Sequence, residues 1–572
     1  MRRLSPSWHR AARPRAVRPS ARGASRPHGP HACVFPPQAT FFGHFCAGRD
    51  ADEIRPTLKR LQRDGVGSIL DYAAEADVNE GSKRSLGVPR DQLSARTYDY
   101  QGESECDFNT DVTLRSIRTA AELSRETGLP GYAAVKVTSI GQPELLQHVS
   151  QALAENRGHF LRHFLGVAGD GVGPEGQGLS HEDGAGVDTG GRRAAVAALR
   201  SDAVSDEVER FAMAGAVPGP GEMDLLVGAA EVAAAASAGM EVPSGLDPGS
   251  GRRLEVGVEE FIAALPASGV DMSRAEAEAL FEEMDRDRSG TVDTLEWVDF
   301  MSTRDLAEQQ VRPSLIVRPG GAKQLGRDEL ARVELMLGRA RRLAEAAAEH
   351  GVTIMFDAEQ TYLQPAIDHV VTRAQSEFNH DRAVVFNTYQ AYLRDSGARV
   401  AMDLERSRRE GFCFGAKIVR GAYMSQERKR AAELGYRDPI QPDIAATHRN
   451  YDAICAKVLD QVAAHSGASF MAASHNQGSV QAVVGRMAEL GINPRDGTVA
   501  FGQLLGMCDH LSLTLGRGGY AVYKYVPYGP IKDVIPYLVR RAEENSGMLA
   551  AAGREVDMRW KEFIRRPPLG IH

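Results

Sequence analysis

The chain has 572 residues, of which 42% are hydrophobic and 25% charged, and its formal net charge is −8. This length exceeds that of an ordinary single domain, and the composition is that of a globular protein with a buried core. The negative charge argues against nucleic acid as a partner, and no run approaches the roughly 18 apolar residues that span a bilayer, so any membrane contact is expected to be peripheral.

The six cysteines are dispersed and form no CxxC pair. This spacing argues against a zinc ribbon or a disulfide framework, and it fits a reducing compartment.

Residues 1–40 differ in composition from the rest of the chain. They are rich in arginine, serine and proline, and the first acidic residue of the chain is Asp50. An arginine-rich, acid-free leader is typical of organellar transit peptides. We expect residues 1–40 to be a disordered mitochondrial transit peptide, with a plastid address or a plain basic tail as alternatives.

Residues 41–160 carry signals of regular structure. The segment "DEIRPTLKRLQRDG" has helical spacing, and "GYAAVKVTSIG" predicts a short buried strand that ends in a turn. Residues 166–192 are rich in glycine and acid, which predicts a flexible linker, and an alanine-rich helical stretch follows to about residue 300.

Within that stretch, residues 285–296 read "DRDRSGTVDTLE" and match the calcium loop of a helix–loop–helix motif. The flanking segments "SRAEAEALFEEM" and "WVDFM" predict its entering and exiting helices, the first with a capping serine. A tightly turned loop with alternating acids offers Ca²⁺ the six or seven oxygens that it needs. The six predicted ligands are Asp285, Asp287, Ser289, Thr291, Asp293 and Glu296.

Such loops normally work in pairs. The segment "LEVGVEEFIAAL" could be an exiting helix, with Glu260 at the last loop position, but the residues before it lack the acids of a calcium loop. A second loop would therefore be degenerate and calcium-free.

From about residue 328, short apolar or aromatic runs alternate with helical segments, which predicts βα units and a parallel sheet. With six or more such units, a (β/α) barrel is favoured over an open sheet. Polar residues follow each predicted strand, where such barrels build their sites. They are Lys136, Asp357, Gln390, Arg420, Tyr423, His475, Asn476, Gln503 and Tyr525.

The segment "YLVRRAEEN", residues 537–545, allows two interpretations. Arg540 and Arg541 lie four and three residues before Glu544, so each could form a weak ion pair on a helix surface. Alternatively, the two guanidinium groups form a clamp for a small carboxylate.

Several segments together resemble proline dehydrogenase of the mitochondrial, eukaryotic type over residues 41–150 and 330–550. They include "AAVKVTSIG", "FDAEQTYLQPAIDH", "FNTYQAYLRD", "GAKIVRGAYMSQERKRAAELGYRDPIQP", "FGQLLGMCDH" and "YKYVPYGPIKDVIPYLVRRAEENS". The resemblance divides the chain into the leader 1–40, a first barrel part 41–160, an insertion 161–325 with the calcium loop, and a second barrel part 326–572.

The resemblance implies a distorted (βα)8 TIM-like barrel, and the calcium-loop motif predicts that the insertion is a helical EF-hand. It also implies noncovalently bound FAD, oxidation of L-proline to Δ1-pyrroline-5-carboxylate, and transfer of the electrons to a membrane quinone. The expected location is the matrix side of the mitochondrial inner membrane, and the insertion adds Ca²⁺ as a second cofactor that modulates activity.

Individual residues take expected roles from the resemblance. Arg540, Arg541 and Lys136 pair with the substrate carboxylate, and Asp357 holds Arg541 in place. The pyrrolidine ring is walled by Tyr423, Leu504 and Tyr525. Glu75 reaches the first arginine and gates the site, whereas Glu543 remains a solvated charge. The expected flavin contacts are Gln390, Lys417, Val419, Gly421, Ala422, His475, Asn476 and Glu544.

Three further observations bear on this resemblance. No GxGxxG motif follows a predicted strand, so a Rossmann-type cofactor site is not supported. Lys417 stands where some bacterial members carry arginine, which makes the flavin contact a point charge. Tyr525 favours proline, because hydroxyproline-preferring relatives carry a smaller residue there. The alternatives are a hydroxyproline dehydrogenase and a catalytically silent calcium-binding barrel scaffold.

Overall fold

A computed structural model describes residues 41–72, 102–164, 255–300 except 267–269 and 271, and 325–541 except 465, 466, 532, 533, 536 and 540. The predicted transit peptide, the glycine-rich segment 166–192 and most of the alanine-rich stretch lie outside the described residues. No described helix is both long enough and apolar enough to cross a membrane.

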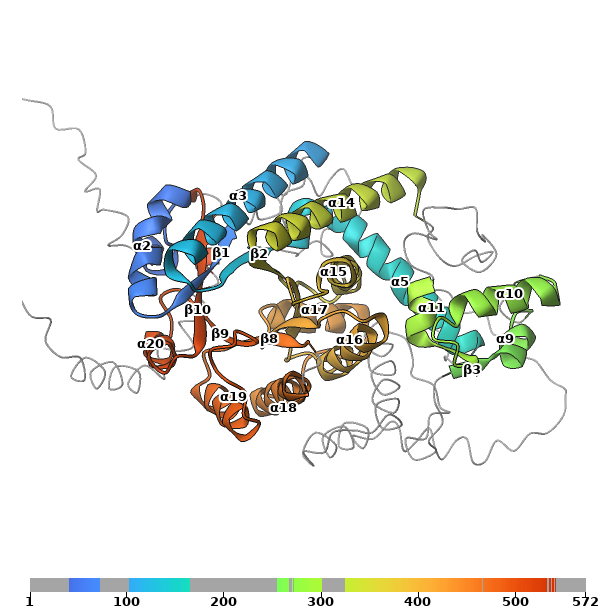
Figure 1. The fold of residues 1–572 in the computed structure, drawn as a ribbon. Helices are drawn as coiled ribbons and strands as arrows, with labels where there is room; N and C mark the ends of the chain where they lie inside the picture. The colour runs from blue at the N-terminus through green and yellow to red at the C-terminus, as the bar shows by residue number, and fades with distance from the viewer. Residues whose placement is uncertain are drawn as a thin grey trace, which may run out of the picture.

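Eight strands form a closed barrel in the order β1-β10-β9-β8-β7-β6-β5-β2, and every neighbouring pair is parallel (Figure 1). The predicted TIM-like barrel is therefore confirmed. Its strands are β1 Gly67–Tyr72, β2 Gly131–Val135, β5 Val352–Phe356, β6 Val385–Gln390, β7 Gly415–Val419, β8 Ser469–Ala473, β9 Val499–Leu504 and β10 Ala521–Tyr528.

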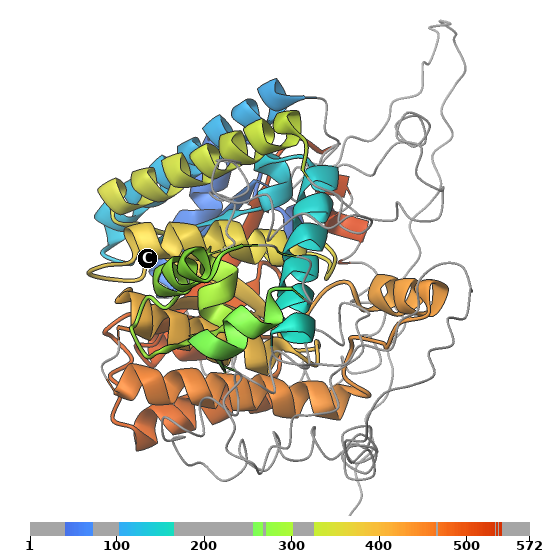
Figure 2. The same ribbon diagram turned by 90° about the vertical axis from the view of Figure 1, so that its right-hand side faces the viewer.

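Helices surround this barrel (Figures 1 and 2). The long helices α3 and α14 pack against each other and against the β2–β5 side. The helices outside the insertion are α1 Phe41–Phe45, α2 Ala51–Arg63, α3 Glu103–Thr127, α4 Val137–Ile140, α5 Pro143–His163, α14 Arg327–His350, α15 Gln364–Phe378, α16 Ser396–Glu410, α17 Met424–Leu434, α18 Ile444–Ala463, α19 Gln477–Glu489 and α20 Asp509–Arg517.

Local signals explain where several helices begin and end. Asp50 caps α2 by accepting hydrogen bonds from the amides of Asp52 and Glu53. Helix α14 ends at Gly351, whose φ of 68° is readily adopted only by glycine. The predicted turn after "GYAAVKV" is instead the short helix α4, which begins directly after Lys136. Strand β1 was not among the strands predicted from sequence pattern.

The barrel interior is filled by alternate residues of its strands. Ile69, Ala134, Met355 and Tyr523 belong to one buried cluster that draws on strands all around the barrel. Strand side chains alternate between two faces, so the residue two positions later points the same way. Those next inward positions, at the carboxyl end of the barrel, are held by Asp71, Lys136, Asp357 and Tyr525.

A separate two-stranded sheet lies between β2 and β5 in chain order. We call Glu255–Phe300 the calcium-loop lobe; it comprises β3 Glu255–Gly257, α9 Val258–Ala264, α10 Arg274–Met284, β4 Thr291–Asp293 and α11 Thr294–Phe300. Ser273 caps the entering helix α10, as predicted. Strands β3 and β4 are antiparallel, with Val256 opposite Val292.

The register identifies a partner for the predicted loop. Val292 is the eighth residue of its loop, and Val256 is the eighth residue of a loop that would end at Glu260. The two glutamates behave alike: Glu296 accepts from the amide of Asp293 at 3.2 Å, and Glu260 accepts from the amide of Gly257 at 3.1 Å. The segment suggested as an exiting helix therefore begins as strand β3 and continues as α9, and a second calcium-loop motif there stays a prediction.

Candidate active site

Charged groups from four barrel strands meet at the carboxyl end of the barrel. The Nζ atom of Lys136 lies 3.2 Å from Oδ1 of Asp71 and 3.2 Å from Oδ2 of Asp357. Lys417 forms an ion pair with the other oxygen of Asp357. The Tyr525 hydroxyl donates to Oδ2 of Asp357 at 2.8 Å. The carboxylate of Asp357 therefore joins β2, β7 and β10.

The protonation states within this group follow from its contacts. Burial alone would raise the pKa of Asp357, but the charges of Lys417 and Lys136 outweigh it and hold the pKa well below its usual range. Burial, followed by the Asp357 charge, raises the pKa of Tyr525 well above its usual value. Asp357 is therefore ionised and Tyr525 protonated near neutral pH, and each holds the groups that it contacts in position.

Asp71 is a member of this group that sequence reasoning missed. Its side chain is buried, and its contact with Lys136 gives the lysine a second carboxylate partner. The quoted segment "LDYAAE" contains it, and the two-residue offset from the buried Ile69 is the signal that could have found it. The signal is weak because strand β1 was itself not predicted.

Asp357 contacts two lysines and a tyrosine, and its expected support of Arg541 stays a prediction. Arg541 is 5% exposed, and its guanidinium lies 5.0 Å from the ring centroid of Tyr537. Arg540, Glu544 and Glu75 lie outside the described residues, as does Glu543. The predicted clamp is therefore represented by Arg541 alone.

The predicted flavin residues near β7 lie in the strand and in the loop that follows it. Lys417 is buried in the middle of the strand and Val419 ends it, whereas Gly421 and Ala422 are exposed in the loop, next to the half-buried Tyr423. Gly421 has a φ of 129°, and a Cβ atom there would lie 2.3 Å from the Tyr392 ring. Both the conformation and the close approach require glycine at this position.

Beside this loop, Arg420 organises a polar cluster at the start of α19. Its guanidinium donates to His448 at 3.1 Å, to Ser479 at 2.7 Å and to Ser474. Asn476 caps α19 by accepting from the amide of Ser479, and its side chain meets His448 at 3.2 Å. A basic group thus lies beside the N-terminus of a thirteen-residue helix, a setting that suits an anion.

His475 and Leu504 are joined directly. The Leu504 amide donates to Nε2 of His475 at 3.1 Å, so this nitrogen is the acceptor of a neutral ring. Burial, together with the charges of Lys524, Arg541 and Arg420, lowers the pKa of His475 to about 3. This histidine is a neutral group at physiological pH.

Gln390 ends β6 as a fully buried residue, and its amide donates to the backbone oxygen of Glu359 at 2.8 Å. The Glu359 side chain accepts from the Thr138 hydroxyl at 2.8 Å. Burial raises the pKa of Glu359 to about 7. Glu359 follows Asp357 by two residues and Thr138 follows Lys136 by two, so their hydrogen bond joins the segments that carry these two site residues.

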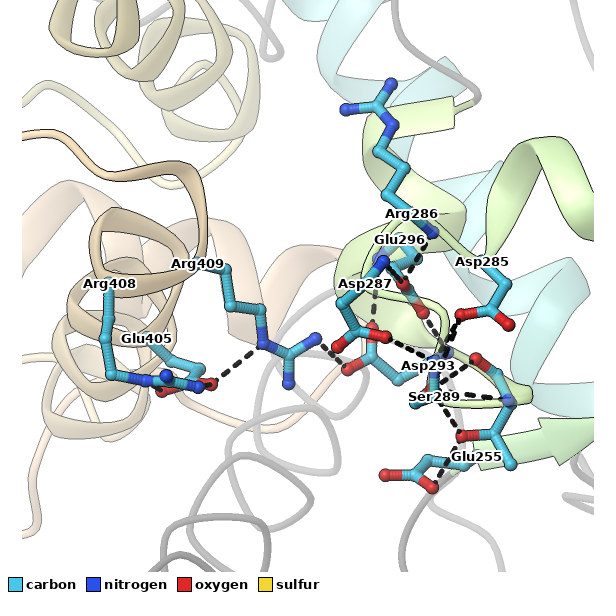
Figure 3. Close-up of polar contacts among 11 residues, drawn as sticks. Glu255, Asp285, Arg286, Asp287, Ser289, Asp293, Glu296, Glu405, Arg408 and Arg409 are labelled. Atoms are coloured by element: carbon cyan, nitrogen blue, oxygen red, sulfur yellow. Dashed lines mark hydrogen bonds and ion pairs between the residues drawn. The ribbon is translucent and has the colours of Figure 1, made fainter.

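The predicted calcium ligands lie together on one loop (Figure 3). Oxygen atoms of Asp285, Asp287 and Glu296 all come within 4.8 Å of one another. Gly290 has a φ of 82°, which provides the sharp turn. Burial, then the nearby charges of Asp293 and Asp287, raise the pKa of Glu296 to about 7 although three amides donate to it.

One contact joins this loop to the barrel (Figure 3). Arg409 of α16 lies 2.5 Å from Oδ2 of Asp293 and 2.8 Å from Oε1 of Glu405. Burial would lower the pKa of Arg409, but these two carboxylates raise it, so the side chain remains charged. Figure 3 also shows Ser289 turned toward the other loop residues, and its hydroxyl donates to the Thr291 oxygen at 3.0 Å.

Comparison with known proteins identifies the family. A family model described as "Proline dehydrogenase" matches residues 264–552, about half of the chain. The human protein named "Proline dehydrogenase 1, mitochondrial" is 36% identical over 563 residues, which cover 92% of this chain and 80% of that one. A Xenopus laevis protein named "Hydroxyproline dehydrogenase" is 47% identical over 229 residues, or 40% of this chain and 49% of that one.

Among solved structures, proline utilization A from Bdellovibrio bacteriovorus, inactivated by N-propargylglycine, aligns with a TM-score of 0.48 and 16% identity. The alignment covers 88% of this chain and 32% of that chain. The family model and the nearly full-length human relative together show that the chain belongs to the proline dehydrogenase family of oxidoreductases.

Proposed function

We propose that the carboxyl end of the barrel binds FAD and oxidises L-proline to Δ1-pyrroline-5-carboxylate, the first step of proline catabolism. The observation that carries this proposal is the Lys136–Asp357–Lys417–Tyr525 group, which presents fixed cations beside an aromatic wall in a barrel of this family. Its opening is where barrels of this kind build their sites.

The substrate carboxylate requires cations that are already fixed in position. Lys136 is held by two carboxylates. Arg541 is buried, and its guanidinium lies over the ring of Tyr537. With Arg540 they would bind the carboxylate from several directions and orient the ring. Tyr525, Leu504 and Tyr423 would wall the ring and exclude water from it.

The residues present fit a flavin. Lys417 offers a cation at the barrel opening, and Arg420 with the N-terminus of α19 offers donors for a pyrophosphate. Gly421 and Ala422 are exposed in the loop that follows Arg420. When bound, FAD supplies the acceptor for the hydride from the substrate. Val419, Gln390, His475, Asn476 and Glu544 complete the proposed set of contacts.

The chain's own residues then act mainly by position. Asp357 stays ionised and Tyr525 stays protonated near neutral pH, so neither is suited to removing a proton from the substrate amine. An amine that arrives neutral needs no base. The proposed contribution of the protein is therefore orientation of the ring and electrostatic stabilisation of the reduced cofactor.

The flavin spectrum of the purified protein tests cofactor and substrate together. We expect absorption near 450 nm that bleaches when L-proline is added without an acceptor. A colourless protein that cannot be reconstituted with FAD would instead support the catalytically silent calcium-binding scaffold.

Hydroxyproline oxidation is the second candidate, because relatives with that name share 45–47% identity over part of the chain. From the family resemblance, Tyr525 would occupy the space that a 4-hydroxyl group needs, so proline is the proposed substrate. Steady-state rates with a dye acceptor should favour L-proline over trans-4-hydroxyproline. Equal or faster turnover of hydroxyproline would reverse this assignment.

The proposed electron acceptor is a membrane quinone, reached from the matrix side of the mitochondrial inner membrane by peripheral association. The mitochondrial names of the relatives support the organelle. Reduction of a soluble quinone analogue during proline turnover, and recovery of the protein with inner-membrane vesicles, test the two parts separately. Failure of either measurement contradicts its part.

The calcium-loop lobe is proposed to bind Ca²⁺ through Asp285, Asp287, Ser289, Thr291, Asp293 and Glu296, and to modulate activity as part of an insertion over residues 161–325. The support is the proximity of three ligand carboxylates and the pairing of β3 with β4. Glu296→Gln should weaken calcium binding about 100-fold by removing a bidentate ligand. Glu282→Gln, on the exposed face of α10, is the matched control.

The regulatory part needs its own readout. Proline turnover is compared for the wild type and Glu296→Gln, each with calcium added or chelated. A calcium effect on turnover that survives Glu296→Gln would contradict regulation through this loop.

A further inference from the structure

Helix α5 connects the barrel to the calcium-loop lobe. Its first turns belong to the barrel, because Leu145, Leu146 and Val149 are buried in the barrel's main cluster. Its last turns belong to the lobe, because Phe160 and Phe164 are buried in the cluster formed by α9, α10 and α11. Figure 1 shows the lobe gathered around this end of the helix.

The contacts are aromatic and involve both exiting helices. The Phe160 ring stacks on Trp297 of α11 at 4.9 Å, and the Phe164 ring stacks on Phe261 of α9 at 5.0 Å. Phe164 also lies 5.1 Å from Trp297. The Trp297 indole N–H donates to the backbone oxygen of Asn156 at 3.2 Å. The end of α5 thus contacts the helix that follows each of the two loops.

These contacts begin one residue after a calcium ligand. Trp297 directly follows Glu296, the last ligand of the loop, and the Glu296 carboxylate already lies with those of Asp285 and Asp287. In paired calcium loops of the sensor type, binding moves the exiting helix and opens an apolar groove for a target helix. Here an apolar helix end of the same chain already fills the space between the exiting helices.

We propose that the C-terminal turns of α5 are an internal target helix of the calcium-loop lobe, so that calcium binding and the packing of α5 favour each other. The inference rests on the proposed calcium site and adds what that site acts on. Because coupling between two sites is reciprocal, loss of the α5 contacts must weaken calcium binding. Equally, calcium must stabilise the end of α5 against local opening.

The test is calcium titration of the full-length, flavin-loaded protein by isothermal calorimetry. Phe160→Ala should raise the calcium Kd by roughly 5- to 150-fold, the usual range for such coupling. Leu153→Ala, on the same helix but packed against the barrel cluster, should leave the Kd within twofold of the wild type. Phe164→Leu keeps an apolar side chain, so it controls for loss of binding through unfolding. The calcium Kd of this variant should rise by a smaller factor.

A second readout follows the contact itself. Trp297 fluorescence, with Trp8→Phe and Trp560→Phe as background, should change on calcium addition, and Phe160→Ala should alter that change. Hydrogen exchange over residues 155–164 should slow with calcium in the wild type but not in Phe160→Ala.

The outcomes separate the two proposals. If the wild type binds calcium and both phenylalanine variants bind within twofold of it, the internal-target inference is overturned while the calcium site stands. If the wild type fails to bind calcium at millimolar concentration, the calcium site is overturned, and the inference falls with it.

Discussion

The barrel site and the calcium loop both gather carboxylates, but they balance the charge in opposite ways. In the barrel, Asp357 lies between Lys136 and Lys417, and its pKa is held well below the usual range. In the loop, Glu296 lies with Asp285 and Asp287, and burial with like charges raises its pKa to about 7.

The difference indicates what each region requires. The barrel site carries its own counter-charges, so its charges are balanced without an ion from outside. The loop concentrates negative charge around one point, and it is relieved either by protons or by a cation from outside. Arg409 is the one cation that the structure pairs with the loop's acids among the described residues, and it reaches only Asp293.

The largest expected effect comes from removing the balance in the barrel. Asp357→Asn leaves Lys136 and Lys417 without their shared carboxylate, and it removes the acceptor of the Tyr525 hydroxyl. We expect kcat/KM for proline to fall by ~10²-fold or more and the free energy of unfolding to fall by about 3 kcal/mol. Dye-coupled kinetics and urea unfolding measure the two effects.

Asp496→Asn, at an exposed loop position, is the control and should change neither quantity. If Asp357→Asn retained full activity and stability, the barrel would not depend on this charge balance.

A smaller effect is expected from Glu359, a barrel carboxylate whose pKa is raised to about 7, as is that of Glu296 in the loop. Its pKa is raised by burial from 4.5 to about 7, so between these values the folded state binds more protons than the unfolded state. Its contribution therefore lowers stability as pH rises from about 4.5 to about 7. Glu359→Gln should remove this slope and add on the order of 1–3 kcal/mol at pH 8.

Urea unfolding at several pH values measures that slope. At pH 4.5, where the carboxyl group is protonated in the folded state and half protonated in the unfolded state, the variant and the wild type should differ much less than at pH 8. An unchanged difference between them at pH 4.5 and pH 8 would show that Glu359 does not titrate in this range.

The smallest effect concerns Arg409, a residue of barrel helix α16 that forms an ion pair with Asp293 of the loop. A cation 2.5 Å from Asp293 opposes Ca²⁺, so Arg409→Gln should tighten calcium binding about two- to fivefold, and less at high salt. Calorimetric titration at two ionic strengths measures this effect.

Arg408→Gln is the matched control for that titration. Arg408 is the adjacent residue and pairs with the same Glu405, but its side chain is 71% exposed. It should alter calcium affinity by less than Arg409→Gln does. Weaker binding in Arg409→Gln would mean that the arginine holds the loop in its binding shape instead of competing with the ion.

The predictability of the two regions from sequence differs for a physical reason. The calcium loop could be predicted from the sequence because its proposed ligands all lie within residues 285–296, and their spacing alone determines which oxygens can meet. The segment that pairs with it was suggested only as an exiting helix, and strand β3 was not predicted, because its loop lacks acids and the pairing of Val256 with Val292 depends on folding.

The barrel was also predicted, because seven of its eight strands are apolar runs followed by polar residues. Strand β1 was not predicted from this pattern, and neither was the role of Asp71, which lies in that strand. The roles of Lys136, Lys417 and Tyr525 came from a family resemblance, since nothing in local spacing brings residues so far apart in the chain to one carboxylate.

The sequence by itself determined the alternation of strands and helices, the calcium-loop motif and the polar residues that end each strand, because these depend on neighbours along the chain. Only the tertiary structure decided which side chains meet: closing the barrel placed Lys136, Lys417 and Tyr525 around Asp357, and Asp71 against Lys136. The same holds for the contacts of Phe160 with Trp297 and of Arg409 with Asp293, because they join segments more than 100 residues apart.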